Sequence, residues 1–175
     1  MEKNTPIIVS VTGWSGSGKT TFCERLIAEL SARGQRVSAA KNSHQDLFID
    51  REGSDSLRFY NSGADAVCLN ANNSMTIFRH NPLKDAEELI RLFSDSEFII
   101  AEGFKALNSI RIEVTGTASL PEEMKNPASG ADIIVYGKTG LKDELLKDND
   151  PATGIRLIHR DDIIAAADFL TELLT

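Results

Sequence analysis

The stretch that most constrains the fold of this chain is GWSGSGKT, at residues 13–20. It fits the phosphate-binding pattern G-x-x-x-x-G-K-[ST], the P-loop, in which glycines let the backbone wrap closely around phosphates. The β-branched run IIVSVT at 7–12 predicts a strand buried on both faces. Apolar residues spaced at i, i+3, i+4 and i+7 from Cys23 predict a helix that begins near Lys19. A strand, this loop and a helix in that order predict a site that binds phosphate.

The predicted tasks of the loop residues follow from P-loop chemistry. Lys19 is expected to reach the β- and γ-phosphates of a nucleotide, and the Thr20 hydroxyl to coordinate Mg²⁺. We therefore predict that Lys19 takes part in catalysis and that Thr20 is a metal ligand. The predicted nucleotide-binding residues are Gly13, Trp14, Ser15, Gly16, Ser17, Gly18, Lys19, Thr20 and Thr21.

Predicted strands alternate with predicted helices along the rest of the chain, which favours an α/β fold. Two further strands are joined only by NNS, which predicts an antiparallel hairpin. We predict a P-loop NTPase: a mostly parallel sheet with helices on both faces and an inserted antiparallel hairpin, with residues 1–175 as a single nucleotide-binding domain. The expected strands are 7–12, 36–40, 66–71, 75–80, 98–101, 110–114, 132–136 and 155–159, and the expected helices begin near Lys19, Ser54, Asn81 and Asp161.

Composition narrows the classes of function. A formal charge of −7 disfavours nonspecific nucleic-acid binding, which needs clustered Lys and Arg. No apolar run approaches the roughly 18 residues that span a bilayer, so we expect no membrane segment. The N-terminus lacks the features of a secretory signal, which predicts a cytoplasmic protein. Cys23 and Cys68 are too few for a disulfide framework, and we expect both to be buried and reduced.

Partners of the P-loop are expected where neighbouring strands end, because ligands of open α/β sheets bind at the carboxyl ends of strands. Glu102 follows the apolar run FIIA, so we predict that it holds Mg²⁺ as a catalytic carboxylate. Asp50 is a further predicted metal ligand, whereas a polar-loop role is preferred for His44 over metal binding. The residues that we predict to face the ligand are Lys41, His44, Asp50, Asp55, Ser56, Gly103 and Lys105.

Four segments together resemble the molybdopterin-guanine dinucleotide biosynthesis protein B (MobB) family. They are GWSGSGKTTF at 13–22, RGQRVSAAKNSHQDLFID at 33–50, GSDSLRFYNSGA at 53–64 and EGFK at 102–105. The resemblance implies a GTP-binding P-loop protein with weak GTP hydrolysis that assists attachment of GMP to molybdenum cofactor. It also implies Mg²⁺, a guanylyltransferase partner, molybdopterin or its derivatives as ligand, and a homodimer.

The chain departs from the family pattern at Asn42, Phe48 and Ser54, where the family usually has histidine, aspartate and lysine. Base specificity rests on the resemblance, because the guanine-reading pattern Asn-Lys-x-Asp is absent and GKTG at 137–140 lacks its carboxylate. The P-loop contains no arginine, and nothing obvious in the sequence supplies a transition-state cation. At most a slow GTPase is expected.

Two alternatives remain open. A small-molecule kinase would use ATP at the same P-loop, with Asp50 or Asp55 as general base. The loop 116–130 has few cations for such a kinase, since its one lysine, Lys125, is outnumbered by the acidic residues Glu122 and Glu123. A purely regulatory or scaffold protein would use the hairpin as a dimer or partner surface, because strand edges pair with other chains.

Overall fold

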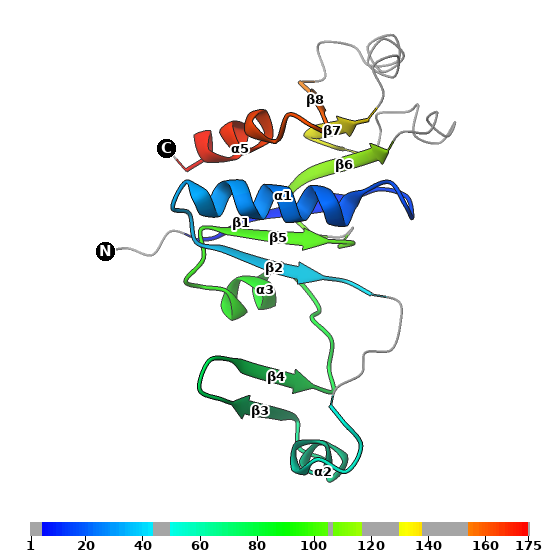
Figure 1. The fold of residues 1–175 in the computed structure, drawn as a ribbon, viewed down its shortest axis with the longest axis vertical. Coiled ribbons are helices and arrows are strands. Elements are labelled where there is room, and N and C mark those ends of the chain that lie inside the picture. The colour runs from blue at the N-terminus through cyan, green and yellow to red at the C-terminus, as the bar shows by residue number, and fades with distance from the viewer. Residues whose placement is uncertain (1–4, 44–49, 105–106, 117–129, 138–153, 175) are drawn as a thin grey trace. The chain divides into compact units, whose positions relative to one another are not determined.

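The computed structural model describes residues 5–43, 50–104, 107–116, 130–137 and 154–174 (Figure 1). The chain divides into two compact units. We call residues 1–42 with 85–175 the sheet unit, and residues 43–84 the hairpin unit. In the described ranges, no helix combines the length and the apolar character that crossing a bilayer requires.

A six-stranded sheet forms the centre of the sheet unit. Its strand order is β2-β5-β1-β6-β7-β8, and each neighbouring pair runs parallel. The strands are β1 (Ile7–Thr12), β2 (Val37–Lys41), β5 (Phe98–Glu102), β6 (Ile110–Gly116), β7 (Ile133–Tyr136) and β8 (Arg156–His159). Because β1 is central, the loop that follows it has strand ends on both sides. The predicted parallel α/β sheet is confirmed.

One face of the sheet packs against α1 (Lys19–Ala32) and α5 (Ile163–Glu172), which lie side by side over it (Figure 1). Val9 and Val11 point into this core, as the two-residue period of a strand requires. The helix α1 contributes Phe22, Cys23, Leu26 and Leu30. Both elements that flank the P-loop are therefore anchored in the main core.

The helix α3 (Ala86–Leu92) belongs to the connection that leads along the chain from β2 to β5. Because such crossovers are right-handed, this path places α3 on the face opposite α1. Leu89 of this helix is fully buried. The predicted start at Asn81 is wrong: the Asp85 carboxylate caps the helix by accepting a hydrogen bond from the Glu88 amide at 2.9 Å.

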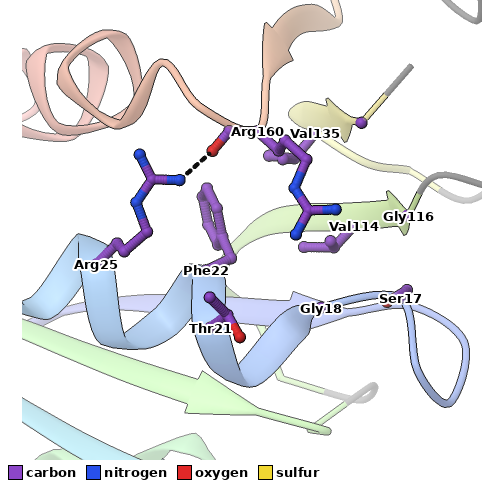
Figure 2. A pocket seen from close by; sticks show the side chains of 10 residues that line it. Ser17, Gly18, Thr21, Phe22, Arg25, Val114, Gly116, Val135 and Arg160 are labelled. Carbon is purple, nitrogen blue, oxygen red and sulfur yellow. Dashed lines mark hydrogen bonds between the residues drawn. The ribbon is translucent and has the colours of Figure 1, made fainter.

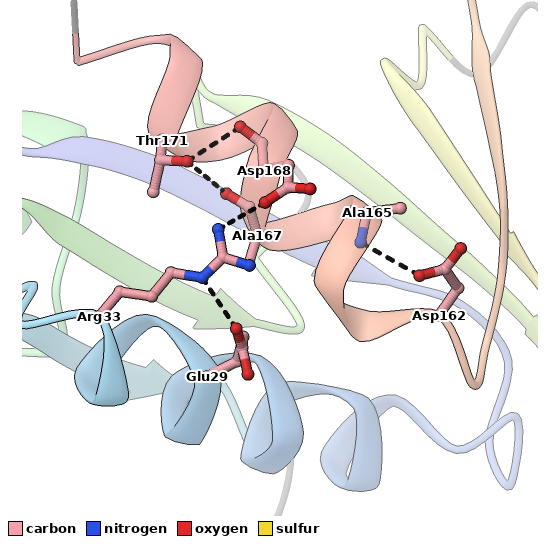
Figure 3. A network of polar contacts seen from close by, with 7 residues as sticks. All are labelled: Glu29, Arg33, Asp162, Ala165, Ala167, Asp168 and Thr171. Atoms are coloured by element: carbon pink, nitrogen blue, oxygen red, sulfur yellow. Dashed lines mark hydrogen bonds and ion pairs between the residues drawn. The ribbon is translucent and has the colours of Figure 1, made fainter.

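The C-terminal end of α1 is tied to α5 by Arg33 (Figure 3). Its Nε donates to Glu29 Oε1 at 2.8 Å, and its Nη1 donates to Asp168 Oδ1 at 2.6 Å. These two hydrogen bonds, led by that to Glu29, raise the pKa of Arg33. Gly34 follows at φ +85°, in the left-handed region that ends helices, as predicted. The two helices are thus joined at the end of α1 that is remote from the P-loop.

The hairpin unit contains α2 (Asp55–Asn61) and the antiparallel strands β3 (Ala66–Asn70) and β4 (Met75–Arg79). The predicted hairpin is confirmed. Ser54 caps α2, because its hydroxyl accepts a hydrogen bond from the Leu57 amide at 3.2 Å. Ser54, one of the departures from the family pattern, therefore has a local structural role.

The two cysteines differ in their surroundings. Burial raises the pKa of the Cys23 thiol to about 12, and the negative charge of Glu102 adds to this rise. The thiol stays protonated near neutral pH, which makes it inert. Cys68 is exposed, so the prediction that both cysteines are buried is wrong for this residue. Cys68 lies directly opposite Ile77 on the neighbouring strand, and Ile77 is also exposed. The two side chains share one face of the hairpin, because alternate residues of a strand point to opposite faces.

Candidate functional site

The P-loop turns the chain from β1 into α1. Gly18 is the N-cap of α1 at φ +94°, and Gly13 has φ +142°. Residues with a side chain rarely adopt either angle. A Cβ at Gly13 would also overlap the carbonyl oxygen of Val114 in β6. The first glycine of the pattern therefore lets the loop pass directly against the neighbouring strand.

The side chain of Lys19 folds back over this loop. Its Nζ donates to the carbonyl oxygen of Gly13 at 2.8 Å and to that of Trp14 at 2.6 Å. The ammonium group is therefore held at the loop that is predicted to bind phosphate. The Trp14 side chain itself is about half exposed, at 52%.

Three predicted site residues, Thr20, Lys41 and Glu102, come together at the ends of β2 and β5. The Thr20 hydroxyl donates to the Glu102 carboxylate at 3.1 Å. Lys41 Nζ lies 3.1 Å from Glu102 Oε1 and donates to Thr20 Oγ1 at 3.3 Å. The register of the strands explains the meeting, because Lys41 is the direct partner of Glu102. A hydroxyl and a carboxylate are the hard oxygen ligands that Mg²⁺ prefers.

Gly103 and Asn42 close the ends of the same two strands. The Asn42 amide donates to the Glu102 carbonyl at 2.9 Å, and its side chain donates to the Gly103 carbonyl at 3.4 Å. Gly103 has φ +81°, and a Cβ there would lie 3.1 Å from the Asn42 carbonyl oxygen. Asn42, another departure from the family pattern, thus helps to hold the backbone beside Glu102.

The surroundings of the loop fit a phosphate chain with Mg²⁺. The Ser17 hydroxyl oxygen is buried without a hydrogen-bond partner among the described residues, a situation that typically costs about 1–3 kcal/mol. A phosphate oxygen could accept its hydrogen, and free amides at the start of α1 suit the same anion. An open pocket of about 370 Å³ adjoins the loop, lined by Ser15, Gly16, Gly18, Lys19, Thr20, Thr21, Lys41 and Glu102.

Three of the described residues predicted to face the ligand belong to the hairpin unit. Asp50 accepts hydrogen bonds from Ser54 Oγ at 2.8 Å, from the Arg51 amide at 2.7 Å and from Ser56 Oγ. These bonds, led by that from Ser56, lower the pKa of Asp50. Asp55 forms an ion pair within α2 at 3.1 Å. Asp50 therefore braces the start of α2, and its predicted role as a metal ligand stays a prediction.

Other predicted residues lie outside the described ranges. They are His44 and Lys105, together with Phe48 among the departures from the family pattern. In the part of the chain that is described, no three side chains of His, Cys, Asp or Glu gather as a metal-binding group. The carboxylate and hydroxyl at Glu102 and Thr20 would accordingly leave most Mg²⁺ positions to phosphate and water, as Mg²⁺ commonly requires.

Arg160 was not predicted from the sequence as a site residue. It directly follows β8, on the side of β1 opposite Glu102, and lies near Gly18 (Figure 2). Its Nη2 is 3.2 Å from the position that a Cβ of Gly18 would take. A small pocket surrounds it, lined also by Ser17, Thr21, Gly116 and Gly137. The rule that pointed to Glu102, a polar residue just after a predicted strand, applies equally to Arg160. The sheet order that brings β8 to this side was not evident from the sequence.

The sequence of this chain is similar to those of one protein family. A family model described as molybdopterin guanine dinucleotide synthesis protein B matches residues 8–136. The molybdopterin-guanine dinucleotide biosynthesis adapter protein of Haemophilus influenzae is 37% identical over 108 residues, which are 60% of each chain. The corresponding Escherichia coli protein is 32% identical over 126 residues, 67% of this chain and 71% of that one. The match thus spans three fifths of the length of the Haemophilus relative.

A solved structure extends the likeness. The crystal structure of Bacillus subtilis MobB has a TM-score of 0.69 to this chain at 25% identity, covering 95% of this chain and 96% of that one. The likeness therefore includes the part of the chain after residue 136, where the family model ends. The predicted fold class and the resemblance drawn from the motifs are confirmed.

Proposed function

Because this chain belongs to the molybdopterin guanine dinucleotide synthesis protein B (MobB) family, we propose that it is a GTP-binding adapter protein in the synthesis of that cofactor. The relatives from Haemophilus influenzae and Escherichia coli carry the adapter description. The proposed partners are a guanylyltransferase of the pathway and molybdopterin or one of its derivatives. They follow from the family resemblance.

The observation that carries the nucleotide-binding part of the proposal is the convergence of Lys19, Thr20 and Glu102. A cation on the loop, a hydroxyl at the first turn of α1 and a carboxylate on β5 are the parts that a P-loop needs for a nucleotide with Mg²⁺. In the proposed complex, loop amides and Lys19 hold the phosphates, while Thr20 and Glu102 hold Mg²⁺. The metal, when bound, neutralises charge on the β- and γ-phosphates.

The proposed nucleotide is GTP, with slow hydrolysis. This choice rests on family membership, since the residues themselves specify only a nucleoside triphosphate. A small-molecule kinase using ATP is less favoured, because the relatives from Haemophilus influenzae and Escherichia coli carry an adapter description. We further propose that residues 1–175 act as one domain in a homodimeric, cytoplasmic protein.

Calorimetric titration with GTP and with ATP, each with Mg²⁺ at matched concentration, tests the proposal. We expect a clear preference for GTP, because the family resemblance implies a GTP-binding protein. Equal or tighter ATP binding would contradict it and favour the kinase. Addition of the protein to a guanylyltransferase reaction tests the adapter role, which predicts a higher yield of the guanine dinucleotide cofactor. An unchanged yield across saturating concentrations would argue against that role.

Substitution of Glu102 by glutamine is expected to reduce the effect of Mg²⁺ on GTP affinity by about tenfold, since it removes a charged metal ligand. The measurement is the ratio of GTP dissociation constants with and without Mg²⁺. Glu113→Gln is a matched control, because Glu113 also accepts a threonine hydroxyl, from Thr12 at 2.5 Å, but on another strand. If Glu102→Gln keeps the wild-type ratio, Glu102 has a structural role only.

A further inference from the structure

Arg160 is fixed at the P-loop by contacts of its own backbone. Its amide donates to the Tyr136 carbonyl at 2.8 Å, and its carbonyl accepts from Arg25 Nη1 at 2.9 Å (Figure 2). A Cβ at Gly137 would lie 2.9 Å from Arg160 Cδ, so the missing side chain at that position leaves room for the arginine stem. The guanidinium group can therefore approach Gly18.

The Arg160 guanidinium group has no hydrogen-bond or ion-pair partner among the described residues, and the carboxylate of the next residue, Asp161, lies instead 3.4 Å from Arg25 Nη1. It lies at the N-terminus of α1, whose first turn contains no acidic residue and whose N-cap makes no side-chain hydrogen bond. That end of a helix carries partial positive charge, so a cation beside it is unfavourable without an anion. The buried, unpartnered hydroxyl of Ser17 lines the same pocket. The Arg160 guanidinium group, the N-terminus of α1 and the Ser17 hydroxyl, each of which favours an anion, thus lie together.

The order of the strands fixes which part of a nucleotide would lie there. Glu102 stands on β5, on one side of β1, whereas β6, β7 and β8 lie on the other side with Arg160 after the last of them. Thr20 and Glu102 would hold Mg²⁺, which in P-loop proteins accompanies the β- and γ-phosphates, so they would mark that end of a bound phosphate chain. A phosphate chain bound in this way would run from the Glu102 side of β1 towards Arg160.

Resting on the proposed nucleotide-binding function, we propose that Arg160 binds the α-phosphate, the phosphate nearest the nucleoside. The arginine fork can donate two hydrogen bonds to phosphate oxygens. This contact is shared by GTP and GDP, because both contain the α-phosphate. It therefore contributes to affinity for either nucleotide without distinguishing the triphosphate from the diphosphate.

The test is a set of titrations of Arg160→Gln with GTP and with GDP, both with Mg²⁺. We expect the two dissociation constants to rise by the same factor, about tenfold to a hundredfold, as for loss of a hydrogen bond to a charged group. Arg160→Lys keeps the charge without the fork, so its loss should be smaller. The apo protein should keep its melting temperature, which a merely structural role of the guanidinium group would lower.

Arg156→Gln is the matched control. It removes an arginine from the opposite end of β8, where the guanidinium lies 4.7 Å from the centre of the Phe169 ring and not at the P-loop. Its nucleotide affinities should equal those of the wild type. Unchanged affinities in folded Arg160→Gln would overturn the proposal, as would a loss for GTP far larger than for GDP, which would place Arg160 at the terminal phosphate.

The proposed function can fail separately from this inference. If the wild type binds neither nucleotide, both are wrong. If the wild type binds both nucleotides and Lys19→Ala weakens them while Arg160→Gln does not, only the assignment of Arg160 is wrong.

Discussion

Replacement of Lys19 by alanine is expected to weaken GTP binding in the presence of Mg²⁺ by about a hundredfold, or roughly 2.7 kcal/mol, the upper part of the range for hydrogen bonds to charged groups. The ammonium group already lies on the loop, bonded to the Gly13 and Trp14 carbonyl oxygens. Phosphate oxygens are stronger acceptors because they are charged. Binding therefore gains charge-assisted hydrogen bonds that alanine cannot make.

The same substitution should leave the fold intact. Lys19 is at the first turn of α1 and contributes no side chain to the main core, and alanine is a strong helix former. Equilibrium titration gives the affinity, and thermal unfolding of the apo protein gives the stability. Lys84→Ala, in the hairpin unit, controls for the loss of one positive charge from an exposed residue. Wild-type affinity in folded Lys19→Ala would remove the P-loop from the proposed function.

Local sequence signals predicted the strand, loop and helix around the P-loop well. The continuous β-branched run gave β1, the i, i+3, i+4 spacing gave α1, and Gly34 marked the end of that helix. The short NNS connection gave the hairpin of β3 and β4. Each of these features depends on residues close together in the chain, so the sequence carries the information directly.

The predictions that were wrong or missing have two kinds of cause. Either neighbouring residues carried competing signals, or the structure depends on contacts between residues far apart in the chain. Asn81 and Asp85 can both cap a helix, and the structure uses Asp85. Cys68 falls in an apolar run, yet the hairpin exposes one of its faces. Arg160 reaches the P-loop only because β6 and β7 place β8 on that side of β1. Strand order over such separations is not encoded in any short motif.

Glu102 could be predicted from the sequence as a site residue, whereas Arg160 could not. Both directly follow or end an apolar strand, so the rule about carboxyl ends of strands covers both. A carboxylate after a buried strand matches a known metal-binding pattern, whereas an arginine in the polar stretch before a helix has no such pattern. Residues that act through placement rather than through a motif are therefore the part of the site that needs a structure.

The second large expected effect is on stability. Gly13→Ala should lower the free energy of unfolding by about 2–6 kcal/mol, adding about 1–3 kcal/mol for the unfavourable backbone conformation to about 1–3 kcal/mol for overpacking. The added methyl group would overlap the Val114 carbonyl oxygen and lie 2.9 Å from Ser17 Oγ. Because the Val114 oxygen belongs to the backbone of a buried strand, it cannot simply rotate away. Urea denaturation measures the change.

Gly16→Ala separates the two causes. Gly16 also has a positive φ, +75°, but a Cβ there would meet nothing within 4 Å. Its substitution should therefore cost only about 1–2 kcal/mol for the left-handed conformation. If the two variants lose the same stability, the close approach of the loop to β6 is not what requires glycine at position 13. If Gly13→Ala loses more, the strand beside the loop sets the shape of the phosphate site, and nucleotide affinity should fall in the same variant.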